Sequence, residues 1–180
     1  MITAKQMAFR FLLPPVILAL LFASLTSSLP GQTPGKGKKG GDADMKADMA
    51  IFHDLLDNRA DIKRTVKNLD DGVETITVSQ KEDVAIKIQA HAEAMHKRVK
   101  EGKGIRLWDP LFVEIFKNYD KVSMKVEKTE KGVKVNEASK DPYVVKLIQA
   151  HAEVVSKFIE SGYEEARKSH PIPAREVPNK

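Results

Sequence analysis

The sequence predicts an α+β fold in which two tandem α-β-β-α repeats form a four-stranded antiparallel sheet with helices packed on one face. Three observations support this fold class. The sequence matches itself at an offset of 60 residues, each matched unit alternates helical and strand-like hydrophobic patterns, and each unit has a glycine at a hairpin turn. A chain of 180 residues suits one domain built from both units.

The strongest match at the 60-residue offset is a hexapeptide. Residues 88–93 read Ile-Gln-Ala-His-Ala-Glu, and residues 148–153 repeat this segment without a change. The same offset pairs glycines and histidines: Gly72 with Gly132, Gly102 with Gly162, and His91 with His151. A chance match of this kind is very improbable, so we interpret repeat one (51–102) and repeat two (111–162) as a tandem duplication.

Each repeat is predicted to contain a helix, two strands joined by a tight turn, and a longer second helix. Apolar residues at helical spacing mark the helices, and alternating apolar residues mark the strands. In repeat one the predicted elements are a helix over 49–58, strands over 62–68 and 73–79, and a helix over 83–101. In repeat two they are a helix over 111–119, strands around 122–126 and 133–135, and a helix over 143–161.

Capping residues set the expected ends of the helices. Ser79 followed by Glu82 predicts a capping box at the start of the long helix of repeat one, and Gly102 predicts its end. Asp109-Pro110 and Asp141-Pro142 each place an N-cap residue before a proline, which is favourable at the first helical position. These signals predict where three of the four helices begin.

The N-terminal segment has the pattern of an export signal. Lys5 and Arg10 precede an uncharged, largely apolar run over 11–25, and small residues follow it. We therefore expect residues 1–28 to be a cleaved signal peptide and the protein to be periplasmic or secreted. An uncleaved N-terminal anchor, with the rest of the chain facing outward, is the alternative.

The remaining segments are assigned by composition. Glycine, proline and lysine predict a flexible linker over 29–43. Residues 44–170 are then a single pseudo-twofold domain, and the prolines of 171–180 predict a loose C-terminal tail.

Composition also limits the classes of partner and site. The chain has no cysteine, which excludes disulfides and thiolate metal sites. Its formal net charge is +5, and loss of Lys5 and Arg10 with the signal would leave 28 basic against 25 acidic residues. So small an excess, spread along the chain, predicts no nucleic-acid partner. After signal cleavage we expect no integral membrane protein.

The two equivalent histidines are the candidate site. His91 and His151 each lie in the middle of the apolar face of a long helix, so both imidazoles are predicted to point inward. Imidazole ligates metals and haem, and Met95, one turn beyond His91, would add a soft ligand for copper. Copper, zinc and haem are therefore the candidate cofactors. The alternative is that both histidines are core residues without a ligand.

A second candidate is the joint between the repeats. Trp108 lies there, and it would either cap the core or expose an apolar surface for a partner. No nucleophile elbow, phosphate loop or metalloprotease motif occurs, so no catalytic residue is predicted.

The duplicated Ile-Gln-Ala-His-Ala segments, together with Asp109-Pro110-Leu111-Phe112 and Asp141-Pro142-Tyr143-Val144-Val145, support a resemblance. The sequence resembles an uncharacterised family of small exported bacterial proteins with a duplicated IQAHA-containing unit. The resemblance covers roughly residues 52–171. It implies a bacterial envelope or secreted setting, and it implies no particular activity.

The sequence therefore leads to one leading hypothesis and two alternatives. The leading one is an exported non-enzymatic binding module with a small-ligand or metal site at the inward-facing histidine pair. The first alternative is a structural or interaction protein of the cell envelope with core histidines and no ligand. An enzyme that uses the histidines as acid–base groups is the least favoured.

Overall fold

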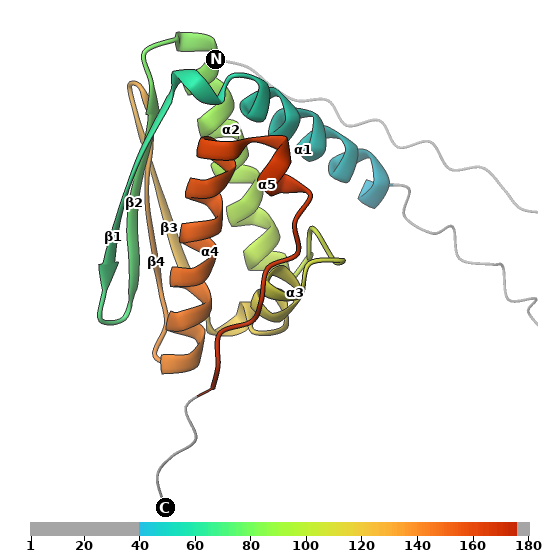
Figure 1. Ribbon diagram of the computed structural model, residues 1–180, viewed down its shortest axis with the longest axis vertical. Coiled ribbons are helices and arrows are strands. Elements are labelled where there is room, and N and C mark those ends of the chain that lie inside the picture. Colours follow the sequence, from blue (N-terminus) through green and yellow to red (C-terminus); the bar gives the residue numbers. More distant parts are fainter. Residues whose placement is uncertain (1–39, 176–180) are drawn as a thin grey trace, which may run out of the picture. The chain divides into compact units, whose positions relative to one another are not determined.

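The computed structural model describes residues 40–175, in which helices cover one face of a four-stranded antiparallel sheet (Figure 1). The predicted α+β fold class is therefore confirmed. The predicted signal peptide (1–28), most of the predicted linker (29–43) and the last five residues lie outside the described residues.

The described residues form two similar series of elements. The first series is α1 (Gly40–Asp57), the 3-10 turn η1 (Arg59–Asp61), β1 (Ile62–Leu69), β2 (Gly72–Ser79) and α2 (Glu82–Glu101). The second is α3 (Pro110–Lys117), η2 (Tyr119–Lys121), β3 (Ser123–Thr129), β4 (Gly132–Ala138) and α4 (Pro142–Ser161), followed by the short α5 (Tyr163–Ala166). That this similarity arose by duplication stays an inference from the sequence.

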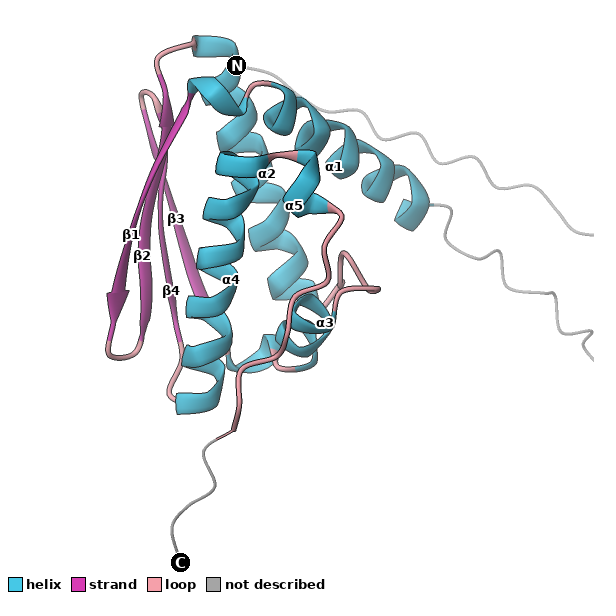
Figure 2. Ribbon diagram, in the orientation of Figure 1, coloured by secondary structure: helices cyan, strands magenta, loops and turns pink. Residues whose placement is uncertain are grey.

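The two hairpins join through their second strands, which gives the sheet order β1-β2-β4-β3 (Figure 2). In the register of β2 with β4, Thr75 lies opposite Val135, its own counterpart at the 60-residue offset. Gly72 lies opposite Ala138, and Gly132 lies opposite Val78. The turn of each hairpin therefore adjoins the end of the other hairpin, and Thr75 and Val135 lie at the centre of the sheet.

Each long helix packs mainly on the hairpin of the other series of elements. The helix α2 packs mainly on β3 and β4, and α4 packs mainly on β1 and β2. The helix α1 packs on α2 and α3 packs on α4, on the side away from the sheet (Figure 1). We call α1 and α3 the outer helices, because they form a layer beyond the long pair α2 and α4.

Apolar side chains fill both interfaces. Between the sheet and the long helices lie two clusters with the buried residues Ile62, Val73, Val84, Ile88, Ala92, Val133, Val135, Val144, Ile148 and Ala152. Between the long pair and the outer helices lies a third cluster with Leu56, Leu111, Phe112, Leu147, Val154 and Phe158. Burial of apolar area at about 25 cal/mol per Å² is the main stabilising term at each interface.

The helix ends agree with the predicted caps in three of four cases. Asp109 and Asp141 each accept a hydrogen bond from a backbone N–H two residues later, and a proline follows each of them. Gly102 ends α2 with φ +64°, a conformation that favours glycine. The predicted capping box is wrong, because Ser79 Oγ accepts from the Lys81 backbone N–H and Lys81 is the N-cap.

The helix α1 begins at Gly40, nine residues before the predicted start. It therefore reaches into the segment 29–43, which composition assigns to the linker. A buried contact ties its N-terminal half to α2, because Arg98 Nε donates to Asp48 Oδ2 at 2.6 Å. A second and more exposed ion pair, Lys97 Nζ with Asp44 Oδ2 at 3.9 Å, joins the two helices nearer the start of α1.

None of the helices in residues 40–175 combines the length and the apolar character that crossing a membrane requires.

Candidate functional site

Both candidate histidines lie on a long helix and contact an outer helix at equivalent places. His91 stacks on Phe52 of α1, with ring centroids 6.1 Å apart. His151 makes an edge contact with Phe112 of α3, at 5.2 Å. The two phenylalanines are themselves 60 residues apart and both contact Phe158. The imidazoles are therefore part of an aromatic cluster that joins the four helices α1, α2, α3 and α4.

The glutamines of the repeated hexapeptide fix the rotation of the long helices. Gln89 Nε2 donates to the Thr129 carbonyl oxygen at 2.8 Å, and Gln149 Nε2 donates to the Leu69 carbonyl oxygen at 3.0 Å. Each glutamine thus binds the turn of the hairpin from the other half. Because His91 and His151 lie two residues further along, these contacts also set the direction of the imidazoles.

Both histidines are held in the neutral form. Desolvation by burial lowers the pKa of His91 to about 4, although the charge of Asp48 acts in the opposite direction. Desolvation likewise lowers the pKa of His151 to about 4, and the charges of Arg64 and His91 lower it further. A positive charge on His91 would therefore disfavour protonation of His151.

The structure adds two charged groups that the sequence analysis missed. Arg64 on β1 and Glu137 on β4 lie on the face of the sheet that the helices cover, as the strand alternation with Ile62 and with Val135 shows. Strand alternation could have identified both residues from the sequence, because charged side chains are rare at the inward positions of a strand. We call Arg64, His91, Glu137 and His151 the central cluster.

Burial perturbs both charged members of the central cluster. Desolvation lowers the pKa of Arg64 to about 10, and desolvation raises the pKa of Glu137 to about 7. Each group moderates the shift of the other electrostatically, but the two form no ion pair in the described part of the chain. At neutral pH the cluster therefore combines a charged guanidinium, a carboxyl group near its midpoint and two neutral imidazoles.

Hydrogen bonding in the central cluster is incomplete. Arg64 Nη1 donates to Thr77 Oγ1 at 2.7 Å. Arg64 Nε and His91 Nδ1 are buried and have no hydrogen-bond partner among residues 40–175. A buried nitrogen without a partner costs about 1–3 kcal/mol, and more when it is charged. These two atoms are the feature of the cluster that most needs an explanation.

Neither charged residue of the central cluster has a charged counterpart in the other repeat. The counterpart of Arg64 at the 60-residue offset is Met124, and the counterpart of Glu137 is Thr77. The histidines, by contrast, are present in both repeats. The cluster is therefore symmetric in its imidazoles and asymmetric in its charges.

The described residues do not gather a metal site. No three histidine, aspartate or glutamate side chains in residues 40–175 lie close enough together to hold a metal ion. Met95 is half-buried one turn beyond His91, and the equivalent Val155 packs in the apolar cluster of the outer layer. The charge of Arg64, which lowers the pKa of His151, also opposes a cation beside it.

A second buried polar network lies at the start of α3. Asp109 is fully buried, and its Oδ2 atom contacts His170 Nδ1 at 2.7 Å and Arg106 Nη2 at 3.2 Å. Burial alone would raise the pKa of Asp109, but the hydrogen bonds from His170 and Arg106 outweigh burial and keep the pKa below its usual value. Sequence patterns give no signal for this pairing, because His170 lies 61 residues away. The network anchors the C-terminal segment to α3.

Replacing Asp109 with alanine is expected to destabilise the protein by about 3 kcal/mol, because it removes an N-cap and leaves Arg106 and His170 buried without their partner. Urea unfolding measures this loss. Asp141→Ala is the matched control, since Asp141 is also an N-cap before a proline but is partly exposed, and its loss should be about 1 kcal/mol. Equal losses in the two variants would show that the buried network contributes nothing.

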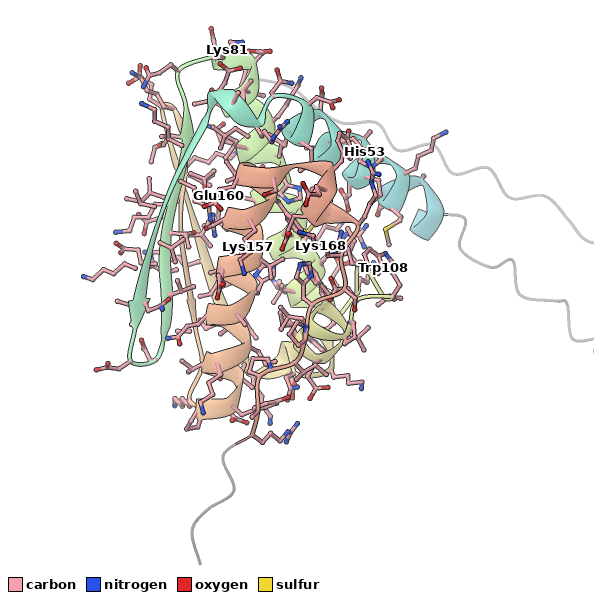
Figure 3. All side chains as sticks on the ribbon, in the orientation of Figure 1. His53, Lys81, Trp108, Lys157, Glu160 and Lys168 are labelled. Carbon is pink, nitrogen blue, oxygen red and sulfur yellow. The ribbon has the colours of Figure 1, made fainter. Side chains whose placement is uncertain are left out.

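Trp108 lies on the loop between α2 and α3, far from the sheet (Figure 3). Its side chain is 56% exposed, and the neighbouring Leu107 is 66% exposed. The Arg106 guanidinium lies 4.4 Å from the Trp108 ring centroid. The tryptophan therefore does not cap the core, and a role as a partner surface stays a prediction.

Comparison of the chain with protein-family models, with curated proteins and with solved structures finds no match. The resemblance to a family of small exported bacterial proteins therefore stays a prediction.

Proposed function

We propose that this protein is an exported non-enzymatic binding module whose site is the central cluster. The observation that supports this function best is the pair of buried, unpartnered nitrogens, Arg64 Nε and His91 Nδ1. Polar atoms in protein interiors are almost always hydrogen-bonded, so two unpartnered ones in one cluster suggest a molecule that binds there. Export rests on the pattern of residues 1–28 alone.

A small polar molecule fits the central cluster better than a metal ion does. The described residues offer no third ligand of the usual kinds beside the histidines, and the Arg64 guanidinium repels a cation. The neutral imidazoles can donate or accept hydrogen bonds toward an uncharged or anionic molecule. Copper, zinc and haem remain useful probes because imidazoles such as those of His91 and His151 ligate all three.

A binding role also suits the protonation state of the histidines better than catalysis does. General acid–base catalysis is most efficient when the pKa of the group lies near the working pH. Burial lowers the pKa of His91 and His151 to about 4, so at neutral pH both rings act as fixed hydrogen-bonding groups. Such groups orient a ligand and transfer few protons.

The competing proposal is a structural or interaction protein of the cell envelope with no ligand. The aromatic packing favours it, because His91 on Phe52 and His151 on Phe112 would stabilise the helix interfaces without any bound molecule. The exposed Trp108 would then be the contact for a partner protein.

The two proposals differ in what the purified protein contains and takes up. Mass spectrometry of the denatured protein detects a co-purified small molecule, and calorimetric titration with copper, zinc and haem tests the other candidates. We expect a ligand by one of these routes, and its loss in a His91→Ala/His151→Ala variant. His53→Ala is the matched control, since His53 is exposed on α1 (Figure 3). An absence of any ligand, or unchanged binding in the double variant, would overturn the binding proposal and favour the structural one.

A further inference from the structure

The loop between α2 and α3 holds two adjacent apolar side chains outward. Leu107 and Trp108 are each more than half exposed, whereas Ile105 on the same loop is buried. Trp108 projects from the side of the domain away from the sheet (Figure 3). We call Leu107 and Trp108 the apolar tip. Single exposed apolar residues are common on proteins, whereas adjoining ones that are held outward indicate a contact with another molecule.

Arg106 prevents the apolar tip from folding back onto the domain. Among the described residues it is the only one other than glycine with a positive φ, +54°, a conformation that is unfavourable for a residue with a side chain. Its guanidinium donates to Asp109 Oδ2 at 3.2 Å. The guanidinium also lies 4.4 Å from the Trp108 ring centroid and 4.9 Å from that of the buried Phe112, so it supports the indole from the inside. The apolar tip is therefore fixed in its exposed position before a partner binds, which lowers the entropic cost of binding.

The small size of the apolar tip favours a lipid surface over a folded protein as its partner. A stable protein–protein interface buries roughly 800 Å² on each partner, and one tryptophan and one leucine supply only a fraction of that area. A lipid bilayer has no fixed shape, so a projecting pair of side chains can enter it without a complementary pocket. Tryptophan is also one of the two residue types that are enriched at the membrane–water interface.

The charges beside the apolar tip are compatible with a lipid surface. Residues 98–109 contain four basic residues and two acidic ones. Both acidic residues are paired, because Glu101 contacts Lys103 at 2.6 Å and the buried Asp109 contacts Arg106 at 3.2 Å. Within this stretch no unpaired carboxylate would therefore repel the phosphate groups of lipids.

The apolar tip follows the end of α2 at which the chain enters the domain. The helix α1 begins at Gly40, and its N-terminal half is joined to the C-terminal end of α2 by the contact of Arg98 Nε with Asp48 Oδ2 at 2.6 Å. The helix α2 ends at Gly102, and the loop with the apolar tip starts there. An N-terminal anchor, the alternative to cleavage of residues 1–28, would therefore tether the domain to a membrane by this end.

We propose that the apolar tip inserts into the headgroup region of a phospholipid bilayer and holds the domain on the membrane surface. The Trp108 ring would contact the upper part of the acyl chains, while its Nε1–H donates to a phosphate or ester oxygen. The Leu107 side chain would be buried at the boundary between headgroups and acyl chains. The proposal does not involve the central cluster, so it is independent of the binding function proposed above.

Trp108 is the only tryptophan in the chain, so tryptophan fluorescence reports the position of the apolar tip alone. The probes are vesicles of phosphatidylcholine, with and without phosphatidylglycerol, in which some acyl chains carry bromine. We expect both kinds of vesicle to shift the Trp108 emission of the full chain to shorter wavelength, and the brominated chains to quench it. Because bromine quenches only at short range, an N-terminal segment bound to the same vesicles would not by itself produce this quenching.

Leu107→Ser should lower the ratio of inserted to free Trp108 by about tenfold, because the leucine side chain is no longer available for burial among the lipids. Ile86→Ser is the matched control, since Ile86 is similarly exposed but lies near the other end of α2, and it should leave the ratio unchanged. Both residues are exposed, so neither substitution is expected to impair folding.

Emission that does not respond to vesicles, or equal losses of insertion in the two variants, would overturn the proposal. A shift to shorter wavelength that appears without vesicles and grows with protein concentration would assign the apolar tip to a contact between two copies of the chain, and would also overturn it.

Discussion

A Gly132→Ala variant is expected to lose at least about 4 kcal/mol of folding free energy, which is a large part of the roughly 5–15 kcal/mol that stabilises an ordinary protein. A methyl group added at Gly132 would lie 2.1 Å from the Thr77 carbonyl oxygen on the neighbouring strand. Gly132 also has φ +152°, which residues with a side chain rarely adopt. The clash is with backbone at the junction of β2 and β4, so no side-chain rotation relieves it.

Gly72→Ala should have an effect of similar size, because its methyl group would lie 1.9 Å from the Glu137 carbonyl oxygen. Far-ultraviolet circular dichroism and urea unfolding measure both variants. Gly104→Ala is the control, since its added methyl group would clash with the end of the exposed Leu107 side chain and otherwise make ordinary contact with Phe116. If the Gly72 and Gly132 variants unfold at the same urea concentration as the control, the two hairpins do not approach as closely as described.

Acid is expected to destabilise the protein through the histidine pair. The pKa values of His91 and His151 are about 4 in the folded protein and about 6.5 in the unfolded chain. Between these values the unfolded chain binds more protons, so the free energy of unfolding falls as pH falls from about 6.5 to about 4. Each shift corresponds to a loss on the order of 3 kcal/mol at pH 4, and the pair to roughly twice that.

Glu137 acts in the opposite direction. Its pKa is raised to about 7 in the folded state, so the folded protein binds more protons than the unfolded chain between about 4.5 and 7. Its contribution is therefore fully present below pH 4.5 and is lost as pH rises to 7. A His91→Gln/His151→Gln variant keeps Glu137 and removes only the two imidazoles, so the difference between its pH profile and that of the unaltered protein isolates the histidines.

Urea unfolding from pH 4 to pH 8 measures both profiles, and the two should diverge progressively below pH 6.5. His53→Gln controls for the loss of a histidine as such, because His53 is exposed on α1. Parallel profiles for the double variant and the unaltered protein would mean that the two rings take up protons in the folded state as readily as in the unfolded chain.

Much of the fold could be predicted because its signals are local. Gly72 and Gly132 mark the hairpin turns, Asp109 and Asp141 mark helix starts, and the 60-residue offset places both halves in register. The start of α1 could not be predicted, because its first turns precede the apolar periodicity and Arg98 holds it from a distance. Such contacts leave no periodic pattern in the sequence.

Of the candidate site, the sequence analysis identified the two histidines, which occur in both repeats, and missed Arg64 and Glu137. Helical phase predicts that His91 and His151 point inward, and in the structure the two rings contact Phe52 and Phe112 of the neighbouring helices. Strand alternation contains the signal for Arg64 and Glu137, but their proximity depends on the pairing of β2 with β4. These strands are separated by two helices along the chain, so their pairing is a property of the assembled sheet.

Because each long helix packs mainly on the hairpin of the other half, the two halves depend on each other for their packing. In a polypeptide with only one α-β-β-α unit, the apolar face of the long helix and the inner face of the hairpin would both lack the partner on which they mainly pack. Two such polypeptides could satisfy all these contacts by associating as a homodimer with an isologous interface through Thr75 and its counterpart. In such a dimer every residue near the axis is present twice, so an interior pair of one arginine and one glutamate is unattainable. Two halves in one chain can differ in sequence, as Arg64 and Met124 do at the 60-residue offset.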